Sequence, residues 1–340
     1  MIDPKQSKVR RSEPGEAVSS HRIVATLVAL AVLALGVIVL RLFAGEPFHW
    51  PDSQILQVRL FRVVLACLVG VALASSGVAL QTLLRNPLAE PFILGLSTGA
   101  TVGLLLLRWL GPQYGHAMVP QHVGAVVGAV ASALVVYFAS RRHGVLDPLG
   151  LLLVGVVLST INGAIIMLLH YMLRGPSPPI EPWMMGHLDE GLDGATVWSA
   201  AATILISFVV LVVVAPSMDV ATFSDDEAQS LGVNLARLRR VLFAVASLLA
   251  GAAVILAGPL AFVGFVCPHL GRLVLGPTHR ILLFASALIG AVMILLSDVV
   301  IVCIDARWNT GQLPMGIFTA VVGGMVFLWM LRSNLKRPEG

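Results

Sequence analysis

The sequence predicts an all-α polytopic membrane protein with about ten transmembrane helices per subunit and both termini in the cytoplasm. Of the 340 residues, 57% are apolar and only 12% are charged, and the mean hydropathy is +0.91. Soluble domains carry about a quarter charged residues, so this chain lacks the polar surface of a water-soluble globule. The composition excludes a soluble enzyme, a secreted disulfide scaffold and a nucleic-acid-binding protein. The basic pI of about 9.3 fits the Lys-rich and Arg-rich cytoplasmic loops of membrane proteins.

Nine apolar windows follow one another along the chain, and one of them has room for two crossings. The windows are 23–40, 60–84, 92–110, 122–139, 146–172, 196–215, 240–267, 278–303 and 314–331. The window 240–267 is interrupted by Gly258 and Pro259. Because proline removes a helical hydrogen bond and clashes with the preceding turn, we expect two passes there, the second one short. The total of ten is the even number that places both termini on one side.

Basic residues predict the orientation of these spans. Sixteen of the 22 Lys and Arg fall in the tails and in the loops on the N-terminal side of the membrane, which the positive-inside rule assigns to the cytoplasm. The loop 174–195 is net acidic and therefore fits the outside. The run 23–40 exceeds the 7–15 apolar residues of a signal peptide. We therefore expect a basic cytoplasmic tail at 1–22, one transmembrane domain at 23–334 and a cytoplasmic tail at 335–340.

The inside loop 216–240 predicts a short cytoplasmic helix at about 224–233. Ser224 and Glu227 have the spacing of a capping box, and Asp225 and Asp226 add the negative charge that favours a helix N-terminus. Gly232 can adopt the left-handed conformation that ends a helix. So short a helix is unstable alone, so it needs a surface to pack against. A docking element for a cytoplasmic partner is favoured over a solvated connector.

Two arginines, Arg59 and Arg62, stand at the outer end of the second span. Their spacing of three places both guanidiniums on one face of a helix. Interfacial snorkelling of the two side chains is one interpretation. The other is a recognition site for carboxylates, because outer ends are where arginine is disfavoured by topology.

Polar side chains also interrupt the spans. They are Ser97 and Thr98 in the third span, Ser159, Thr160 and Asn162 in the fifth, and Asp298 near the outer end of the ninth. Uncharged residues of this kind commonly join helices by hydrogen bonds, whereas an ionisable residue is a functional candidate or an ion-paired residue at a helix end. No row of carboxylates or histidines crosses the bilayer, which disfavours a proton-coupled or sodium-coupled transporter.

The sequence carries no recognisable catalytic or metal site. It lacks a Walker motif, an HExxH motif and a Gly-x-Ser-x-Gly elbow, and its three cysteines are interpreted as small buried hydrophobic residues. Outer histidines at His49, His116, His122 and His187 could ligate haem iron, but scattered loop histidines are more often solvated. Gly124, Gly128 and Ser132 recur at a spacing of four, which predicts close helix packing.

Several segments, among them Arg59–Arg62, Arg85–Pro91 and Ala228–Val233, together resemble one family, the FecCD-type permeases of bacterial type II ABC importers for iron-siderophores, haem and cobalamin. Arg59-Leu60-Phe61-Arg62 resembles that family's Arg-Leu-Pro-Arg, and Arg85-Asn86-Pro87-Leu88-Ala89-Glu90-Pro91 its Arg-Asn-Pro-Leu-Ala-Asp-Pro. Further similar segments are Gly95–Ala100, Trp183–Leu188, Ala228–Val233, Phe262–Arg272 and Leu313–Ala320. Seven such segments occur in order from about 59 to 330, so chance does not explain them.

The resemblance implies a permease without catalytic residues that works as a homodimer in the bacterial inner membrane. It also implies a cytoplasmic ATPase dimer, which would bind ATP and magnesium, and a periplasmic substrate-binding protein. No cofactor or metal would be bound by this chain, and lipid would surround it. The helix at 224–233 would be the coupling helix, formed by Ser224, Asp225, Asp226, Glu227, Ala228, Leu231, Gly232 and Val233. Arg59 and Arg62 match arginines that receive glutamates of the binding protein.

The sequence departs from the family pattern at a few positions. Phe61 replaces proline, His187 replaces serine and Gln312 replaces glutamate. Val302 stands where the family tends to have an outer arginine, a docking role that Arg307 is expected to take over.

The expected cargo is an iron complex, either siderophore-bound or haem, with cobalamin as the alternative. The path would be lined by Ser97, Thr98, Ser159, Thr160, Asn162, Met184 and Met185, since methionine adapts to large ligands. A membrane scaffold or sensor that uses the 216–240 helix is the alternative from another class, and a secondary transporter is a third.

Overall fold

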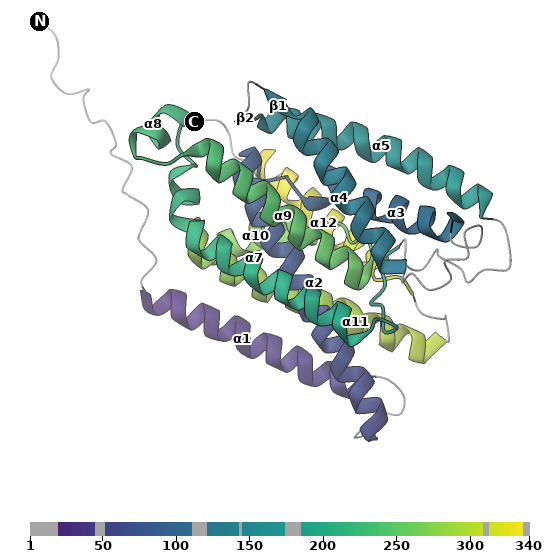
Figure 1. Cartoon of the computed structure of the whole chain (residues 1–340). Coiled ribbons are helices and arrows are strands. Elements are labelled where there is room, and N and C mark those ends of the chain that lie inside the picture. The colour runs from purple at the N-terminus through teal and green to yellow at the C-terminus, as the bar shows by residue number, and fades with distance from the viewer. Residues whose placement is uncertain are drawn as a thin grey trace, which may run out of the picture.

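The computed structural model describes residues 20–44, 52–110, 121–142, 145–173, 185–308 and 313–335. This part of the chain is almost entirely helical (Figure 1). Its α-helices are α1 (Ser20–Phe43), α2 (Ser53–Leu84), α3 (Leu96–Leu110), α4 (Gln121–Ala139), α5 (Pro148–Met172), α7 (Gly194–Val220), α8 (Asp225–Ser230), α9 (Leu235–Ala257), α10 (Val263–Leu275), α11 (His279–Trp308) and α12 (Met315–Leu335). A 3-10 helix, η1 (Pro91–Leu94), precedes α3, and two short antiparallel strands, β1 (Arg141–Arg142) and β2 (Val145–Leu146), precede α5.

The helices coincide with the predicted apolar windows. Six of them, α1, α2, α5, α7, α9 and α11, are long and apolar enough to cross a membrane. Three shorter apolar helices, α3, α4 and α12, lie in the remaining windows, and a fourth, α10, begins inside the window 240–267 and extends beyond it to Leu275. The all-α polytopic fold is therefore confirmed, and the count of ten complete crossings stays a prediction.

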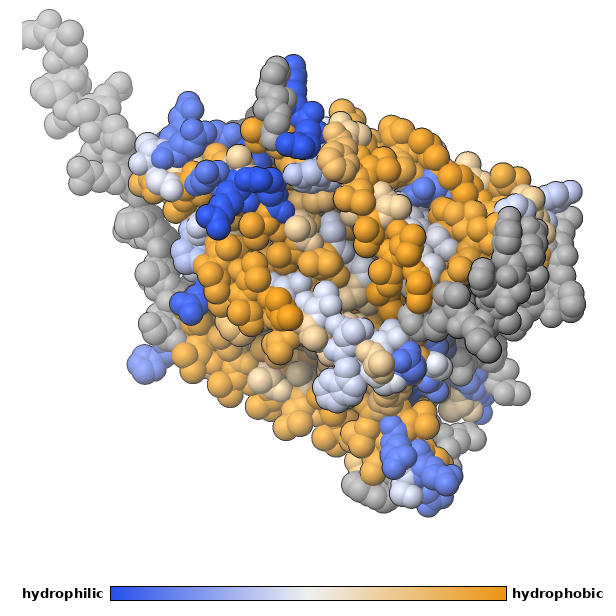
Figure 2. All heavy atoms as spheres, in the orientation of Figure 1, coloured by the Kyte–Doolittle hydropathy of each residue, from blue (hydrophilic) through white to orange (hydrophobic). Residues whose placement is uncertain are grey.

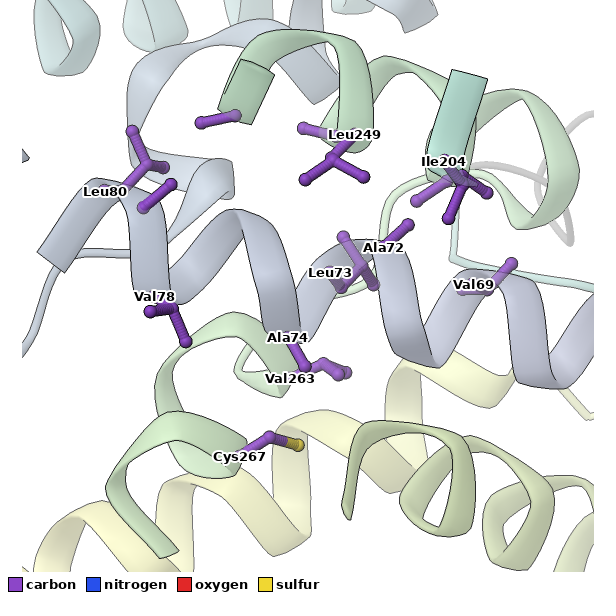
Figure 3. Packing of buried hydrophobic residues seen from close by; sticks show 14 of the residues in the cluster. Val69, Ala72, Leu73, Ala74, Val78, Leu80, Ile204, Leu249, Val263 and Cys267 are labelled. Atoms are coloured by element: carbon purple, nitrogen blue, oxygen red, sulfur yellow. The ribbon is translucent and has the colours of Figure 1, made fainter. Parts of the chain in front are cut away.

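Helix α2 is the centre of the bundle. Of the residues in its most apolar stretch 78% are buried, against 6% in α1. It packs against α1, α5, α7, α9, α10 and α11. Figure 3 shows Leu80 and Leu73 on the side of α2 that meets α9 and α7, and Val78 and Ala74 on the side that meets α10. A helix that is apolar all round is typical of such a fully surrounded position.

The window 240–267 is divided where the sequence predicts. Helix α9 ends at Ala257, Gly258 follows with a φ of 66°, and α10 begins at Val263. The first backbone amides of α10 need acceptors, and the carboxylate of Glu90 accepts a hydrogen bond from the amide of Phe262 at 3.0 Å. Because Gly264 packs on Gly77, two turns before α2 ends, α10 starts inside the bundle and is correspondingly short.

Close packing of α3 on α4 depends on the glycine spacing that the sequence shows. A Cβ on Gly103 would lie 2.0 Å from the carbonyl oxygen of Gly124, and one on Gly128 would lie 2.1 Å from that of Gly99. No larger side chain fits at these crossings, so the interpretation of this spacing as helix packing is confirmed.

One face of the molecule displays the expected surface of a membrane protein. Figure 2 shows a broad hydrophobic area that lies between hydrophilic residues near α8 and further hydrophilic residues at the opposite end of the bundle. Large apolar side chains are exposed along α1, α4, α5 and α7. Such extensive apolar exposure is stable only in lipid or against a partner.

Candidate functional site

The helix α8 begins with the capping box that the sequence predicts. The hydroxyl of Ser224 accepts a hydrogen bond from the amide of Glu227 at 3.3 Å, and the carboxylate of Glu227 accepts one from the amide of Ser224 at 3.0 Å. The hydroxyl of Ser224 also donates to this carboxylate at 2.7 Å, and this bond, together with the one from the Ser224 amide, favours the charged carboxylate and lowers the pKa of Glu227. The helix start is therefore specified by its own sequence.

The same helix is terminated by a left-handed Gly232, as predicted, which directly follows the C-cap Leu231. Gly232 has a φ of +85°, and its amide donates to the carbonyl of Gln229 at 2.9 Å. The amide of Val233 donates to the carbonyl of Ala228 at 3.0 Å, which completes a Schellman motif. A Cβ at Gly232 would meet no atom within 4 Å, so only the backbone conformation restricts this position.

Asp225 connects α8 to the rest of the bundle. Its carboxylate pairs with Arg85 at 2.7 Å and with Arg239 at 2.9 and 3.1 Å. Arg85 ends α2 in the left-handed conformation and also donates to the carbonyl of Ala221 at 3.1 Å. Arg239 lies in the first turns of α9. A displacement of α8 therefore acts directly on two long helices.

The outer surface of α8 and its flanks remains open. Ala228 is fully buried against the chain, whereas Phe223 and Leu231 are 54% and 63% exposed. Asp226 is also exposed and adds negative charge beside them. Two large apolar side chains beside a charged, well-capped helix suit a protein partner.

A second polar group at this end was not anticipated from the sequence. The imidazole of His279 lies between the carboxylate of Asp219 at 2.7 Å and the hydroxyl of Thr82 at 2.9 Å. Close by, the guanidinium of Arg272 donates to the side-chain oxygen of Gln81. Four residues of this group, Gln81, Thr82, Arg272 and His279, line a cavity of about 260 Å³ together with Arg85. Its members come from α2, α7, α10 and α11, so no local spacing could have revealed it.

At the opposite end of the bundle, Arg62 is part of a buried ion cluster. Its guanidinium pairs with Asp298 of α11 and with Glu190, and Asp298 pairs in turn with Arg41 of α1. Asp298 is fully buried and Glu190 is 35% exposed. Asp298 is therefore ion-paired, as one interpretation of the sequence suggested, but it lies ten residues before the end of α11 and not at a helix end.

This burial differs from the exposed arginine pair that the sequence suggested. Arg62 pairs with two carboxylates of its own chain. Arg59 is also buried, and its guanidinium donates to the carbonyl of Leu42. The docking role of both stays a prediction. His187 lies near this cluster, and burial together with the positive charge of Arg62 lowers its pKa. Arg307 is exposed at the end of α11, where a partner can reach it.

The polar residues within the spans divide into two sets. Asn162 of α5 donates to the hydroxyls of Thr98 at 3.1 Å and Ser132 at 3.3 Å, and it lies 3.4 Å from the carbonyl of Gly95. Asn162, Ser132 and Ser97 are buried. These contacts join α3, α4 and α5, which supports the packing interpretation for Asn162 and Thr98.

The second set faces outward. Thr160 is exposed on α5, and its hydroxyl donates to the carbonyl of Val156 on the same helix. Met185 is 52% exposed, and its carbonyl accepts from the amide of Gly316 at the start of α12. Ser159 is half-buried beside Gly95, and Met184 lies outside the described residues. Among the described residues of the predicted path, Thr160 and Met185 are the ones classed as exposed, and the path itself stays a prediction.

Comparison with known proteins agrees with this architecture. Residues 21–333 match the model of the FecCD transport family. The chain is 38% identical over 280 residues to the cobalamin import system permease protein BtuC of Halobacterium salinarum, which covers 82% of this chain and 73% of that one. It is 35% identical over 289 residues to the hemin transport system permease protein HmuU of Yersinia pestis, which covers 84% and 85%.

A solved structure described as an inward-facing conformation of a metal-chelate type ABC transporter has the same fold. The TM-score is 0.79 at 27% sequence identity, over 91% of this chain and 99% of that one. Because the family model matches residues 21–333, nearly the whole chain, the chain belongs to the FecCD transport family.

Proposed function

We propose that the chain is the membrane-spanning permease subunit of an ATP-driven importer and carries an iron complex, siderophore-bound or haem, from the periplasm to the cytoplasm. The observation that carries the proposal is the attachment of α8. Asp225 holds this exposed, capped helix to α2 and α9, and its apolar flanks at Phe223 and Leu231 are uncovered. A partner that binds this helix and moves it would displace α2 and α9 as well, and so transmit its motion into the membrane-spanning helices.

The ATPase belongs to a separate subunit in this proposal. Two copies of it would bind ATP and magnesium in the cytoplasm and contact α8 of each permease. A periplasmic binding protein would deliver the cargo at the Arg62 end of the bundle, where Arg307 is exposed. This orientation in the inner membrane agrees with the basic residues at the α8 end, which include Arg85, Arg239 and Arg240.

A second copy of the chain would complete the path. Helix α5 supports this step, because only 17% of its most apolar stretch is buried within one chain. Thr160 lies on that open surface together with Met167, which is 77% exposed. A path formed between two such surfaces would be wide and weakly polar, as a large cargo requires. The homodimer predicts that α5 of one copy can be crosslinked to α5 of its partner.

The class of cargo rests on the relatives. The similar protein from Yersinia pestis is a hemin permease and the similar solved structure is of the metal-chelate type. The similar protein from Halobacterium salinarum imports cobalamin, which makes cobalamin the second candidate. Iron complexes and cobalamin are both large and of mixed polarity, so the lining of the path does not separate them.

Reconstitution tests the proposal. The permease dimer, its ATPase and its binding protein are placed in proteoliposomes, and ATP-dependent uptake of haem, a ferric hydroxamate, a ferric catecholate and cobalamin is measured. We expect uptake of one of the iron complexes. Uptake of cobalamin alone would replace the cargo but keep the mechanism, and failure with all four would contradict the proposed function.

A further inference from the structure

A long groove runs between α4, α7 and α9 on the face drawn in Figures 1 and 2. Its volume is about 690 Å³, which is within the range of ligand sites. Its wall is mostly apolar, with Val130 and Leu134 of α4, Ala200 of α7, and Phe243 and Leu248 of α9. The groove exists because α9 presents small residues here, and a Cβ at Gly251 would meet no atom within 4 Å. None of the described residues fills this space.

The groove contains few hydroxyls, and that of Ser247 is buried without a hydrogen-bond partner among the described residues. The hydroxyl of Ser199 donates to the carbonyl of Thr196 at 2.8 Å, and that of Thr203 donates to the carbonyl of Ser199 at 2.8 Å. Both are satisfied within α7. An apolar groove is poorly hydrated, and an empty one forfeits dispersion contacts along its whole wall. The wall therefore favours a hydrocarbon occupant.

The end of the groove nearest α8 is positively charged. Arg240 lines it, is exposed and donates to the carbonyl of Ala236 on its own helix at 3.3 Å. No carboxylate of the described residues pairs with its guanidinium, whereas the neighbouring Arg239 is neutralised by Asp225. Arg141 lies 5.4 Å from the ring centre of Tyr137, another residue of the groove. The guanidinium of Arg240, which has no carboxylate partner among the described residues, therefore lies at one end of a mostly apolar groove.

We propose that this groove is a binding site for an anionic phospholipid, with the phosphate at Arg240 and one acyl chain along α9. Arg240 and Ile255 mark the two ends on α9 and are fifteen residues apart, or about 22 Å along the helix. That exceeds half of the roughly 30 Å hydrocarbon core, so an acyl chain of one leaflet fits along it. Basic pockets between helices on the cytoplasmic side are typical sites for anionic headgroups. In the orientation proposed above, Arg240 meets that leaflet.

Native mass spectrometry of the delipidated, full-length protein tests the site by titration with phosphatidylglycerol and with phosphatidylcholine. We expect a preference of about fivefold for phosphatidylglycerol, the effect of one arginine near the membrane surface. Arg240→Gln should remove this preference and Arg240→Lys should retain it. Arg280→Gln is the matched control, because Arg280 is an exposed arginine at the same end of the bundle but outside the groove.

A second pair of variants tests the acyl-chain part separately. Gly251→Leu fills the groove and should weaken binding of both lipids. Gly36→Leu, a change on α1 that also meets no atom within 4 Å, should weaken neither. Preference that survives Arg240→Gln, or lipid binding that survives Gly251→Leu, would overturn the proposal. A loss of oligomer in Gly251→Leu with unchanged lipid binding would also overturn it, since the groove would then be an interface between protein chains.

Discussion

Asp225 and Arg85 form an ion pair at 2.7 Å that joins the first turn of α8 to the residue at which α2 ends. The 32 residues of α2 extend from there for about 48 Å. Near its other end, Arg62 of α2 is held by Asp298 and Glu190. One buried helix is thus attached by ion pairs both to α8 and, near its other end, to Asp298 and Glu190. A force on α8 has a direct route to the far end of the bundle.

Neutralising Asp225 should uncouple ATP hydrolysis from transport. Asp225→Asn removes the counter-charge of Arg85 and Arg239. Because Asp225 is 44% exposed, we expect the free energy that attaches α8 to the bundle to fall by about 1 kcal/mol. Uptake by the reconstituted importer should fall about fivefold, while the ATPase still hydrolyses ATP. Asp226→Asn is the control, because Asp226 is exposed on the same turn and forms no ion pair with the described residues. Equal uptake by Asp225→Asn and Asp226→Asn would refute the role of the ion pair.

The end of α8 should be sensitive to backbone conformation and insensitive to side-chain size. Gly232→Val places a β-branched residue at a φ of +85°, so the left-handed conformation that ends α8 should become less favourable by about 1 kcal/mol or more. ATP-driven uptake should be lost while membrane insertion survives. Gly232→Asn should retain most of the uptake, because asparagine tolerates the left-handed conformation. Normal uptake by a purified Gly232→Val complex would contradict the assignment of α8 as the coupling helix.

The ion cluster at the far end should be a determinant of stability. Asp298→Asn leaves Arg41 and Arg62 buried without their shared carboxylate, and breaking such a cluster costs about 3–5 kcal/mol. Thermal unfolding in detergent should therefore begin at a distinctly lower temperature. Glu190→Gln should have a much smaller effect, because Glu190 is 35% exposed and water can solvate Arg62 in its place. A similar midpoint for Asp298→Asn and the unchanged protein would rule out this role.

Docking of the binding protein should depend on Arg307. Arg307→Glu reverses an exposed charge at the end of α11, so it should weaken the affinity for an acidic partner at low salt and the effect should shrink at high salt. Affinity is measured with the permease in nanodiscs. Arg280→Glu at the α8 end is the control and should change nothing there. An unchanged affinity of the binding protein for the Arg307→Glu permease would contradict the docking role of Arg307.

Local rules predicted the parts of this fold that depend on neighbours in the sequence. The break at Gly258 and Pro259, the capping box at Ser224 and the left-handed Gly232 all follow from the conformational preferences of single residues. The apolar windows likewise locate the helices, because a span must be apolar wherever it faces lipid.

Contacts between distant segments could not be read in the same way. Arg62 meets Asp298 across 236 positions and Asp225 meets Arg85 across 140, and no periodicity connects such residues. The exposed arginine pair expected from the sequence is buried for this reason. A carboxylate inside one span and arginines at the same depth of two others are the signal that could have found the cluster.

ATP-dependent transport in sealed proteoliposomes tests the central claim most directly. The permease, its ATPase and its binding protein are reconstituted, and uptake of the iron complex is compared with ATP inside and no ion gradient, and with a proton or sodium gradient and no ATP. The account predicts uptake only with ATP, and its loss in Gly232→Val. Uptake that follows the ion gradient in the absence of ATP would contradict it.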